Sequence, residues 1–485
     1  MRPTPTDGFP SSTSKLQTET EAILQKYIPN DVESASDESD KSVLNKQLHI
    51  QFLARNLIQG FPARYISQDA SQPWLLFWTL HALCILQVSL DPGNRQRAVD
   101  TVLAWQHPDG GFSGGPGQAA HLLPTYASVC TLAIVGRPGS GGGWDQIDRK
   151  KMYDFFMSLK QPDGSFLVSH HGEVDVRGIY CLLVSATLLN ILTPELVAGT
   201  PAFVASCQTY EGGFASASQP YYDLAGVLLD SPRPPLGEAH GGYTFCAVAS
   251  WVMLQPFISA AAGPPPAINI SLLLRWLVSM QGIEAELGGF KGRTNKLVDG
   301  CYSWWIGGCF ALLEALGVGG ANPVSSEGHT VEHADDEYSW NDVDDSIFNR
   351  KALQEYLLYV GQHPAGGLRD KPPKGADAYH TLYDLSGLSA AQHHVFPSPK
   401  RRQQVADAWT LSEGEDELRK TVFLDALWWV EEEGGSKFVG GSGNRVNATH
   451  PIFNVTITHT EGIMAHFYKQ TIPPRILKGA QTTAV

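Results

Sequence analysis

The sequence has few of the features that mark a secreted, membrane-spanning or nucleic-acid-binding protein. Its 485 residues include seven cysteines, an odd number at irregular spacing, so a reducing compartment is favoured over a disulfide framework. The net charge of −14 disfavours a nucleic-acid backbone as partner. The N-terminus has no apolar core of a signal peptide, and the apolar run at 245–254 is too short to span a membrane. We therefore expect a cytoplasmic protein with no transmembrane segment.

Strand-like alternation is scarce, and a repeat dominates the chain instead. Five segments contain a glutamine, a glycine turn and a closing apolar residue, namely Phe112, Phe166, Phe214, Phe290 and Leu368. The closing residues lie 54, 48, 76 and 78 positions apart, and the two long gaps contain insertions. The underlying period of roughly 50 residues is typical of repeat architectures. An amphipathic segment precedes each turn, and a segment that is apolar nearly all round follows it.

These paired segments predict an all-α fold, an α/α toroid. Amphipathic helices suit an outer ring, and helices that are apolar all round suit an inner ring. The alternative is an open solenoid that binds a protein on its concave face. We expect a single toroid over 46–475, and residues 1–45, which are polar and proline-rich, to lack fixed structure. Insertions are expected at the surface near 215–239, 321–346 and 411–445, with a tail at 476–485.

Polar residues recur nine positions after the closing residues, where inner helices should begin: His121, Asp175, Asp299 and Asp377. Helix caps explain such residues, and we adopt that interpretation for His121 and Asp175. Because the inner helices of a toroid all start at one end, these positions should converge on one cavity mouth. Asp299, Cys301 and His380 would bring a carboxylate, a thiolate and an imidazole to this mouth. That set suits Zn²⁺ and leaves its fourth position open.

Basic and aromatic side chains are concentrated near the same predicted mouth. His240, Arg293 and Lys296, with Tyr302 nearby, favour a phosphate or diphosphate, although two ordinary basic residues in a solvated loop would give the same pattern. The aromatic residues of these segments are Trp74, Trp78, Tyr180, Tyr243, Trp304, Trp305, Tyr379 and Tyr383. Core packing is the default explanation for them, whereas their place beside a metal and a diphosphate favours a long apolar substrate with a charged head.

Several long motifs resemble the CaaX protein prenyltransferase β-subunit family, and within it the farnesyltransferases. They are "DGGFSGGPGQ", "EAHGGYTFC", "GRTNKLVDGCYSWW", "GGLRDKP" and "DAYHTLYDLSGLS", and the match runs from about residue 70 to 395 and again, more weakly, at 449–455. The resemblance implies one catalytic Zn²⁺ bound by Asp299, Cys301 and His380. Its open position would take the cysteine thiol of a protein ending in a CaaX sequence, and this thiolate would attack farnesyl diphosphate.

The resemblance also implies roles for the remaining site residues. His240, Arg293, Lys296 and Tyr302 would stabilise the leaving diphosphate, with Lys296 and Tyr302 counted as catalytic. Asp370 would help to hold Mg²⁺ against the diphosphate. Residues bordering farnesyl diphosphate would include Arg177, Tyr180, Gly242, Tyr243, Cys246 and Trp305. Trp74, Trp78 and Tyr379 would contact the peptide. The enzyme would be an obligate heterodimer with a separate α subunit.

Two alternatives belong to related toroid enzymes. The β subunit of geranylgeranyltransferase type I shares the fold and the zinc set, but the acid at Asp370 and the bulk of Trp74 and Tyr383 favour farnesyl. The stretch "DVDD" (342–345) fits the acid motif of class II terpene cyclases, yet it lies in an acidic insertion where chance matches are easy. His329 and His333 of that insertion are four residues apart, and we interpret them as part of a solvated loop.

Overall fold

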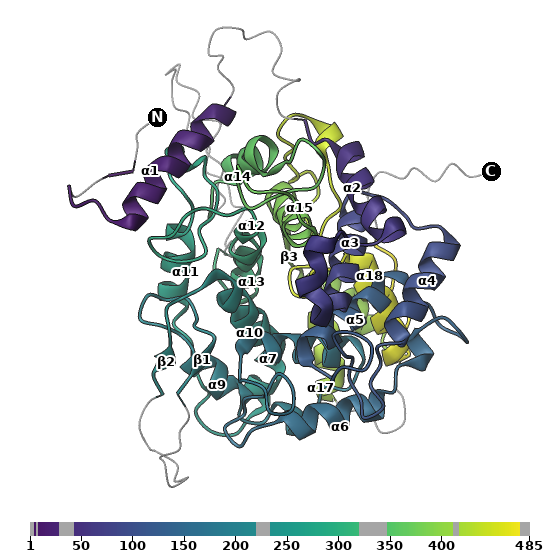
Figure 1. Cartoon of the computed structure of the whole chain (residues 1–485). Coiled ribbons are helices and arrows are strands. Elements are labelled where there is room, and N and C mark those ends of the chain that lie inside the picture. The colour runs from purple at the N-terminus through teal and green to yellow at the C-terminus, as the bar shows by residue number, and fades with distance from the viewer. Residues whose placement is uncertain are drawn as a thin grey trace, which may run out of the picture.

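The computed structural model describes residues 4–5, 8–28, 43–219, 233–319, 347–410 and 417–475. Helices arranged in two concentric rings make up most of this part of the chain (Figure 1). The inner ring consists of α3 (Gln72–Ile85), α5 (Leu122–Val135), α7 (Val176–Leu188), α10 (Gly241–Ala260), α12 (Tyr302–Trp305) with α13 (Gly307–Ala315), and α15 (Ala378–Gln392). The predicted α/α toroid is confirmed.

The outer ring alternates with the inner one along the chain. It consists of α2 (Lys46–Gln59), α4 (Pro92–Leu103), α6 (Arg149–Leu159), α8 (Pro194–Val197) with α9 (Thr200–Ser206), α11 (Ile270–Ser279), and α14 (Arg350–Tyr356) continued by a π turn, η5 (Leu357–Gly361). Burial follows the sequence pattern. In α5 every residue except Leu123 is buried, whereas α6 buries only Met152, Phe155, Phe156 and Leu159, a single stripe at helical spacing.

The inner ring is closed, because α15 packs against α3 as well as against α12. Each neighbouring pair in between, from α3–α5 to α10–α13, is also in contact. The chain is therefore not the open solenoid that the repeat alone would have allowed.

The glycine turns fix each outer helix to the next repeat. In each turn a short bridge joins the two ends, as between Gln106 and Phe112 or between Gln208 and Phe214. Gly110 has φ +106°, and a Cβ there would lie 2.1 Å from the carbonyl oxygen of Lys151 in the next outer helix. The repeated glycine is therefore required both by its backbone conformation and by backbone-to-backbone packing.

The N-terminal segment differs from the expectation of no fixed structure, which is wrong for residues 11–28. They form α1 (Ser12–Leu24) and the short turn η1 (Gln25–Tyr27), and α1 packs against η4 (Glu284–Glu286). Leu24 is fully buried, and Gln17 Nε2 donates to Glu286 Oε1 at 2.8 Å. One buried apolar residue and paired polar side chains hold this helix, so its composition resembles that of an unstructured chain.

The insertions also differ from simple surface additions. Within 411–445, α17 (Glu417–Leu427) packs against α7, α10, α16 (Pro399–Asp407) and α18 (Ile457–Tyr468), and it buries Val422, Phe423, Leu424 and Leu427. The surface assignment of that segment is wrong, because its apolar residues complete the core beneath the inner ring. Within 215–239, β1 (Ala217–Ser218) pairs with β2 (Pro235–Leu236). Segments 321–346, which contains "DVDD", His329 and His333, and 476–485 lie outside the described residues.

The remaining short elements join the rings. Strand β3 (Val395–Pro397) pairs with β4 (Trp429–Glu431), and 3₁₀ turns occur at η2 (Ala63–Ser71), η3 (Trp144–Gln146) and η6 (Ser442–Asn444). One helix of the described part, α10, has 20 residues and is long and apolar enough to cross a membrane. It exceeds the ten-residue run considered from the sequence, but it packs within the toroid against α7, α13 and α17.

Candidate active site

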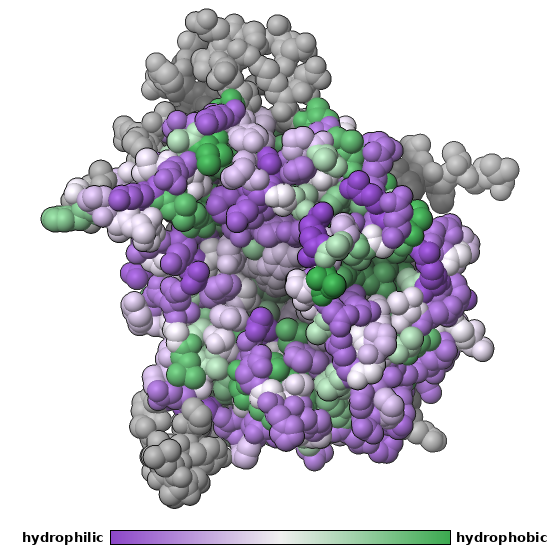
Figure 2. Space-filling model, in the orientation of Figure 1, coloured by the Kyte–Doolittle hydropathy of each residue, from purple (hydrophilic) through white to green (hydrophobic). Residues whose placement is uncertain are grey.

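The starts of the inner helices share one capping pattern at one end of the toroid. His121 Nδ1 and Asp175 Oδ1 accept the backbone N–H two residues further on, which confirms both as helix caps. His240 Nδ1 does the same for Gly242, and Asp299 Oδ1 for Cys301, at 3.1 and 3.0 Å. The repeat therefore places Asp299 of the predicted metal set and His240 of the predicted diphosphate set at equivalent positions. Figure 2 shows a hollow in the middle of the face in view, where the inner helices of Figure 1 meet.

Asp299, Cys301 and His380 come together as the sequence predicts. One ligand atom from each lies within 4.8 Å of the others, and this is the one such group of three in the described part of the chain. His380 Nε2 lies 3.3 Å from Asp299 Oδ1. Burial and the Asp299 carboxylate raise the pKa of the Cys301 thiol, so Cys301 is a neutral thiol when no cation neutralises the cluster. One oxygen, one sulfur and one nitrogen ligand at this spacing, with the sulfur buried, fit a zinc ion.

Asp377 fixes the orientation of the imidazole in this cluster. Its Oδ1 caps α15 by accepting the backbone N–H of His380, and its Oδ2 lies 2.6 Å from His380 Nδ1. A proton on Nδ1 leaves Nε2 facing Asp299. Such carboxylate–histidine pairs set the tautomer of metal ligands. The sequence placed Asp377 at a helix start but did not identify this second contact; its position three residues before the predicted ligand His380 was the available signal.

His240 and Tyr302 form the centre of the predicted diphosphate site. The lower pKa of His240, about 4, follows mainly from burial and then from Arg293 and Arg177, so the ring is neutral at pH 7. Nδ1 accepts from Gly242, so the proton sits on Nε2, 3.1 Å from the Tyr302 hydroxyl oxygen. Nε2–H therefore donates to Tyr302, and the tyrosine O–H stays free to donate to an anion.

Neighbouring side chains complete this site. Arg177 binds Asp175 through Nη2 at 2.7 Å and stacks over the Tyr243 ring, which in turn contacts His240. Gly292 lies against Tyr302; a Cβ there would come within 1.8 Å of the phenol ring. This glycine therefore lets the loop approach the phenol.

The two predicted cations of the diphosphate site, Arg293 and Lys296, make no hydrogen bond with His240 or Tyr302 in the described structure. Arg293 Nη1 lies 2.6 Å from Glu238 Oε1, an ion pair that the sequence did not predict. Lys296 is exposed, and its side chain makes no hydrogen bond or ion pair within the described residues. Asp370 joins the metal cluster through its backbone, since its carbonyl oxygen accepts from Gly300 N at 2.8 Å. Its Oδ1 lies 2.5 Å from Lys371 Nζ.

Aromatic side chains form a closed circuit around the inner ring, with neighbouring ring centroids 4.3 to 5.7 Å apart. We call this set the aromatic circuit. Its members, in order, are Trp74, Tyr126, Tyr180, Phe245, Trp305, Tyr383, Tyr379 and Trp78. Trp305 Nε1 donates to Tyr379 Oη at 2.9 Å, and Tyr180 Oη donates to the Ile452 carbonyl at 2.8 Å.

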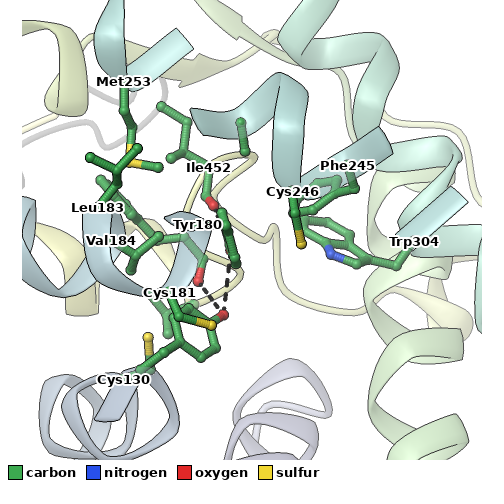
Figure 3. Packing of buried hydrophobic residues seen from close by; sticks show 14 of the residues in the cluster. Cys130, Tyr180, Cys181, Leu183, Val184, Phe245, Cys246, Met253, Trp304 and Ile452 are labelled. Atoms are coloured by element: carbon green, nitrogen blue, oxygen red, sulfur yellow. Dashed lines mark hydrogen bonds between the residues drawn. The ribbon is translucent and has the colours of Figure 1, made fainter. Parts of the chain in front are cut away.

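The circuit joins the peptide and isoprenoid residues that were predicted separately. Tyr126 and Phe245 were missed by the sequence analysis because plain core packing explains them equally well. Cys246 is buried on the helix that supplies Phe245, and Trp304 packs against Phe245 with centroids 5.2 Å apart (Figure 3).

Asp384 is a further residue that sequence reasoning missed. It is fully buried one turn after His380, and neither carboxylate oxygen has a hydrogen-bond partner in the described structure. Burial raises its pKa well above the usual value, so the group is a neutral acid. A Cβ at Gly300 would lie 2.5 Å from its oxygen, which places Asp384 directly beneath the turn between Asp299 and Cys301.

Comparison with known proteins now gives the family. A model of the prenyltransferase α/α-toroid domain matches residues 44–455. The chain is 36% identical to the protein farnesyltransferase subunit beta of Pyricularia oryzae over 92% of this chain and 79% of that protein, and 38% identical to that of Saccharomyces cerevisiae over 79% and 78%. The chain belongs to the protein farnesyltransferase β-subunit family. It is thus a prenyltransferase chain.

A solved structure supports the fold of this prenyltransferase chain. Candida albicans protein geranylgeranyltransferase-I, complexed with GGPP, has a TM-score of 0.56 and 17% identity, covering 87% of this chain and 99% of that one. At this identity the likeness shows the fold alone.

Proposed function

We propose that the chain is the catalytic β subunit of a protein farnesyltransferase, which transfers farnesyl from farnesyl diphosphate to the cysteine thiol of proteins ending in CaaX. The cluster of Asp299, Cys301 and His380 beside the His240–Tyr302 pair and the aromatic circuit carries this proposal. It puts a thiol-binding metal site, an anion site and an apolar wall next to one another.

The metal cluster would hold one Zn²⁺ through Asp299, Cys301 and His380. Bound zinc is a Lewis acid that lowers the pKa of a substrate thiol, so that a thiolate is present at neutral pH. The protein contributes the geometry: Asp377 keeps the Nδ1 proton of His380 in place, and Cys301 is buried beside the partly exposed Asp299 and His380. In the transfer, the sulfur–C1 bond forms, the C1–oxygen bond breaks, the thiol proton is released, and diphosphate leaves.

The leaving group gains negative charge as the C1–oxygen bond breaks. Tyr302, whose hydroxyl is oriented by His240, would donate a hydrogen bond to it, and Arg293 and Lys296 would supply positive charge. Arg293 would exchange its partner Glu238 for the diphosphate, since both groups of that ion pair are partly exposed. Asp370 would share Mg²⁺ with diphosphate oxygens, because Mg²⁺ is commonly held by one or two carboxylates and substrate phosphates. Lys371 would have to move aside for this.

The aromatic circuit would bind the apolar parts of both substrates. Tyr180 and Trp305, with Arg177, Gly242, Tyr243 and Cys246 nearby, would border the isoprenoid. Trp74, Trp78 and Tyr379 would face the peptide. An α subunit would complete the heterodimer. The seven cysteines are all unpaired, which supports a reducing compartment and hence the cytoplasm.

A competition assay tests this proposal. The chain is co-expressed with an α subunit and given equal farnesyl and geranylgeranyl diphosphate with one CaaX peptide. We expect the cysteine to gain a C15 chain, identified by mass. A C20 product would move the chain to geranylgeranyl transfer, and no alkylation of the peptide would contradict a protein prenyltransferase altogether.

A further inference from the structure

We propose that the toroid carries a second ligand site, for a small anion of phosphate chemistry, at the end opposite the metal cluster. This site is independent of the proposed farnesyl transfer. It is a cavity of about 840 Å³ at the C-terminal ends of α3 and α5, bounded also by α16, β4 and the start of α18. The metal cluster lies at the N-terminal ends of the inner helices, so the toroid separates the two sites.

The lining of the cavity is strongly cationic. Its basic residues are Arg95, Lys400, Arg401, Arg445 and Arg475, and its acidic residues are Glu431 and Glu433. This excess of positive charge occurs in a chain whose net charge is −14. One of the two acids is already engaged, because Glu431 Oε1 lies 2.7 Å from His393 Nδ1 and accepts from Ser436 at 2.9 Å.

Arg401 is the residue that points most directly to a missing anion. Its side chain is only 3% exposed. One nitrogen, Nη2, reaches Glu461 at 3.0 Å and the Pro473 carbonyl at 2.9 Å, while Nε and Nη1 have no hydrogen-bond partner in the described residues. Glu461 is shared with Arg475, so one carboxylate faces two guanidinium groups. Buried, unpartnered cationic N–H groups are costly unless an acceptor satisfies them.

The other walls suit a phosphate with an organic body. Arg95 and Lys400 make no ion pair or hydrogen bond with their side chains among the described residues, so both are available to a ligand. The 12-residue helix α18 begins at the cavity with Ile457 and Thr458 in its lining, while the N–H of His459 is already capped by the Thr456 hydroxyl. Val88, Leu90 and Ile134 form an apolar wall beside these donors. Guanidinium groups match phosphate oxygens in pairs.

Calorimetry on the heterodimer tests the site, with inorganic phosphate, pyrophosphate and phenyl phosphate as probes. The background is Lys296→Gln, which weakens anion binding at the active site. The double variant Arg95→Gln/Lys400→Gln should lose at least tenfold in affinity for the remaining site, because neither side chain has a structural partner. The control Lys15→Gln/Lys26→Gln removes the same charge from exposed positions of the N-terminal segment and should bind as the parent does. If phenyl phosphate binds more tightly than inorganic phosphate, the ligand is an organic phosphate. If the two bind equally, the ligand is free phosphate.

The proposal is overturned if the Lys296→Gln heterodimer binds none of the probes. It is also overturned if the Arg95→Gln/Lys400→Gln pair and the control pair bind equally. Thermal unfolding of each variant without probe shows whether it is folded. As a second measurement, pyrophosphate should raise the thermal midpoint of the Lys296→Gln heterodimer by clearly more than that of the variant that also carries Arg95→Gln/Lys400→Gln. A farnesyl transfer assay that fails would not affect either outcome.

Discussion

Asp377 Oδ2 lies 2.6 Å from His380 Nδ1, while its other oxygen caps α15, the helix that contains His380. One carboxylate therefore starts α15 and orients the imidazole of the proposed zinc site. The capping residue and the proposed metal ligand are thus only three residues apart in the sequence.

Asp377→Ala should separate these two roles. Loss of the cap should cost about 1 kcal/mol in the free energy of unfolding. Loss of the Nδ1 partner should lower zinc affinity by roughly 10 to 100-fold, because the ring is no longer held in one tautomer. Asp148→Ala is the matched control, since Asp148 caps α6 through Lys151 N and is not part of the metal cluster. Zinc titration against a competing chelator measures the effect, and equal affinity in both variants would remove Asp377 from the site.

Asp370→Lys should remove the requirement for Mg²⁺. The new ammonium would take the place of the ion's charge beside the diphosphate, so the rate should be nearly the same with and without Mg²⁺. Asp370→Asn is the control, since it removes the carboxylate and supplies no charge, and it should be slow under both conditions. Steady-state rates across a Mg²⁺ titration decide the matter. A Lys variant as dependent on Mg²⁺ as the parent would show that the ion is held elsewhere.

Trp74→Thr should relax the choice of chain length. Trp74 packs against Tyr126 and Trp78 in the aromatic circuit, with Tyr383 three positions away around it. A C20 chain would gain a few kcal/mol from its extra carbons at about 0.8 kcal/mol per CH₂, so a preference for C15 must come from a steric clash. Removing the indole should allow geranylgeranyl transfer with normal zinc content. An unchanged C15 preference in competition would place the length limit at another residue.

The repeat made most of the fold predictable. The glutamine–glycine–phenylalanine turns fix where outer helices end, and the all-apolar segments after them identify the inner ring. The same register aligned Asp299 with His121 and Asp175, which is why the proposed metal and diphosphate residues could be placed at one mouth. At these positions the residue that caps a helix in the local sequence also lies at one end of the toroid in the folded chain.

Other parts depend on contacts that sequence does not display. Helix α1 is held by Leu24 and by Gln17 on Glu286, partners that are 269 residues apart in the latter pair. Segment 411–445 was expected at the surface, but its helix α17 packs against α7 and α10, which lie far away in the chain. Asp384 is buried without a hydrogen-bond partner among the described residues, which no propensity predicts.

His394 should make stability depend on pH. The Glu314 carboxylate, 2.9 Å from His394 Nε2, raises the pKa of His394, and burial lowers it. Glu432, 2.8 Å from Nδ1, raises it further. A histidine whose pKa is raised by folding stabilises the folded state fully at pH values below its unfolded-state pKa of about 6.5. This contribution disappears as the pH rises through its folded-state pKa. The stability difference between the parent and His394→Gln should therefore be largest near pH 6 and shrink at higher pH. Glu314→Gln should flatten the profile similarly. Thermal midpoints over pH 5.5 to 9 measure this, and a parallel pair of profiles would contradict it.

Zinc content and thiol alkylation in Cys301→Ala test the central claim most directly. The variant heterodimer should hold well below one zinc and should not alkylate a CaaX peptide, because the thiolate ligand is gone. It should still bind farnesyl diphosphate, since His240 and Tyr302 are intact. Metal analysis, a product assay and a diphosphate-binding measurement on the same preparation give all three values. Full zinc and normal farnesyl transfer in Cys301→Ala would contradict the account.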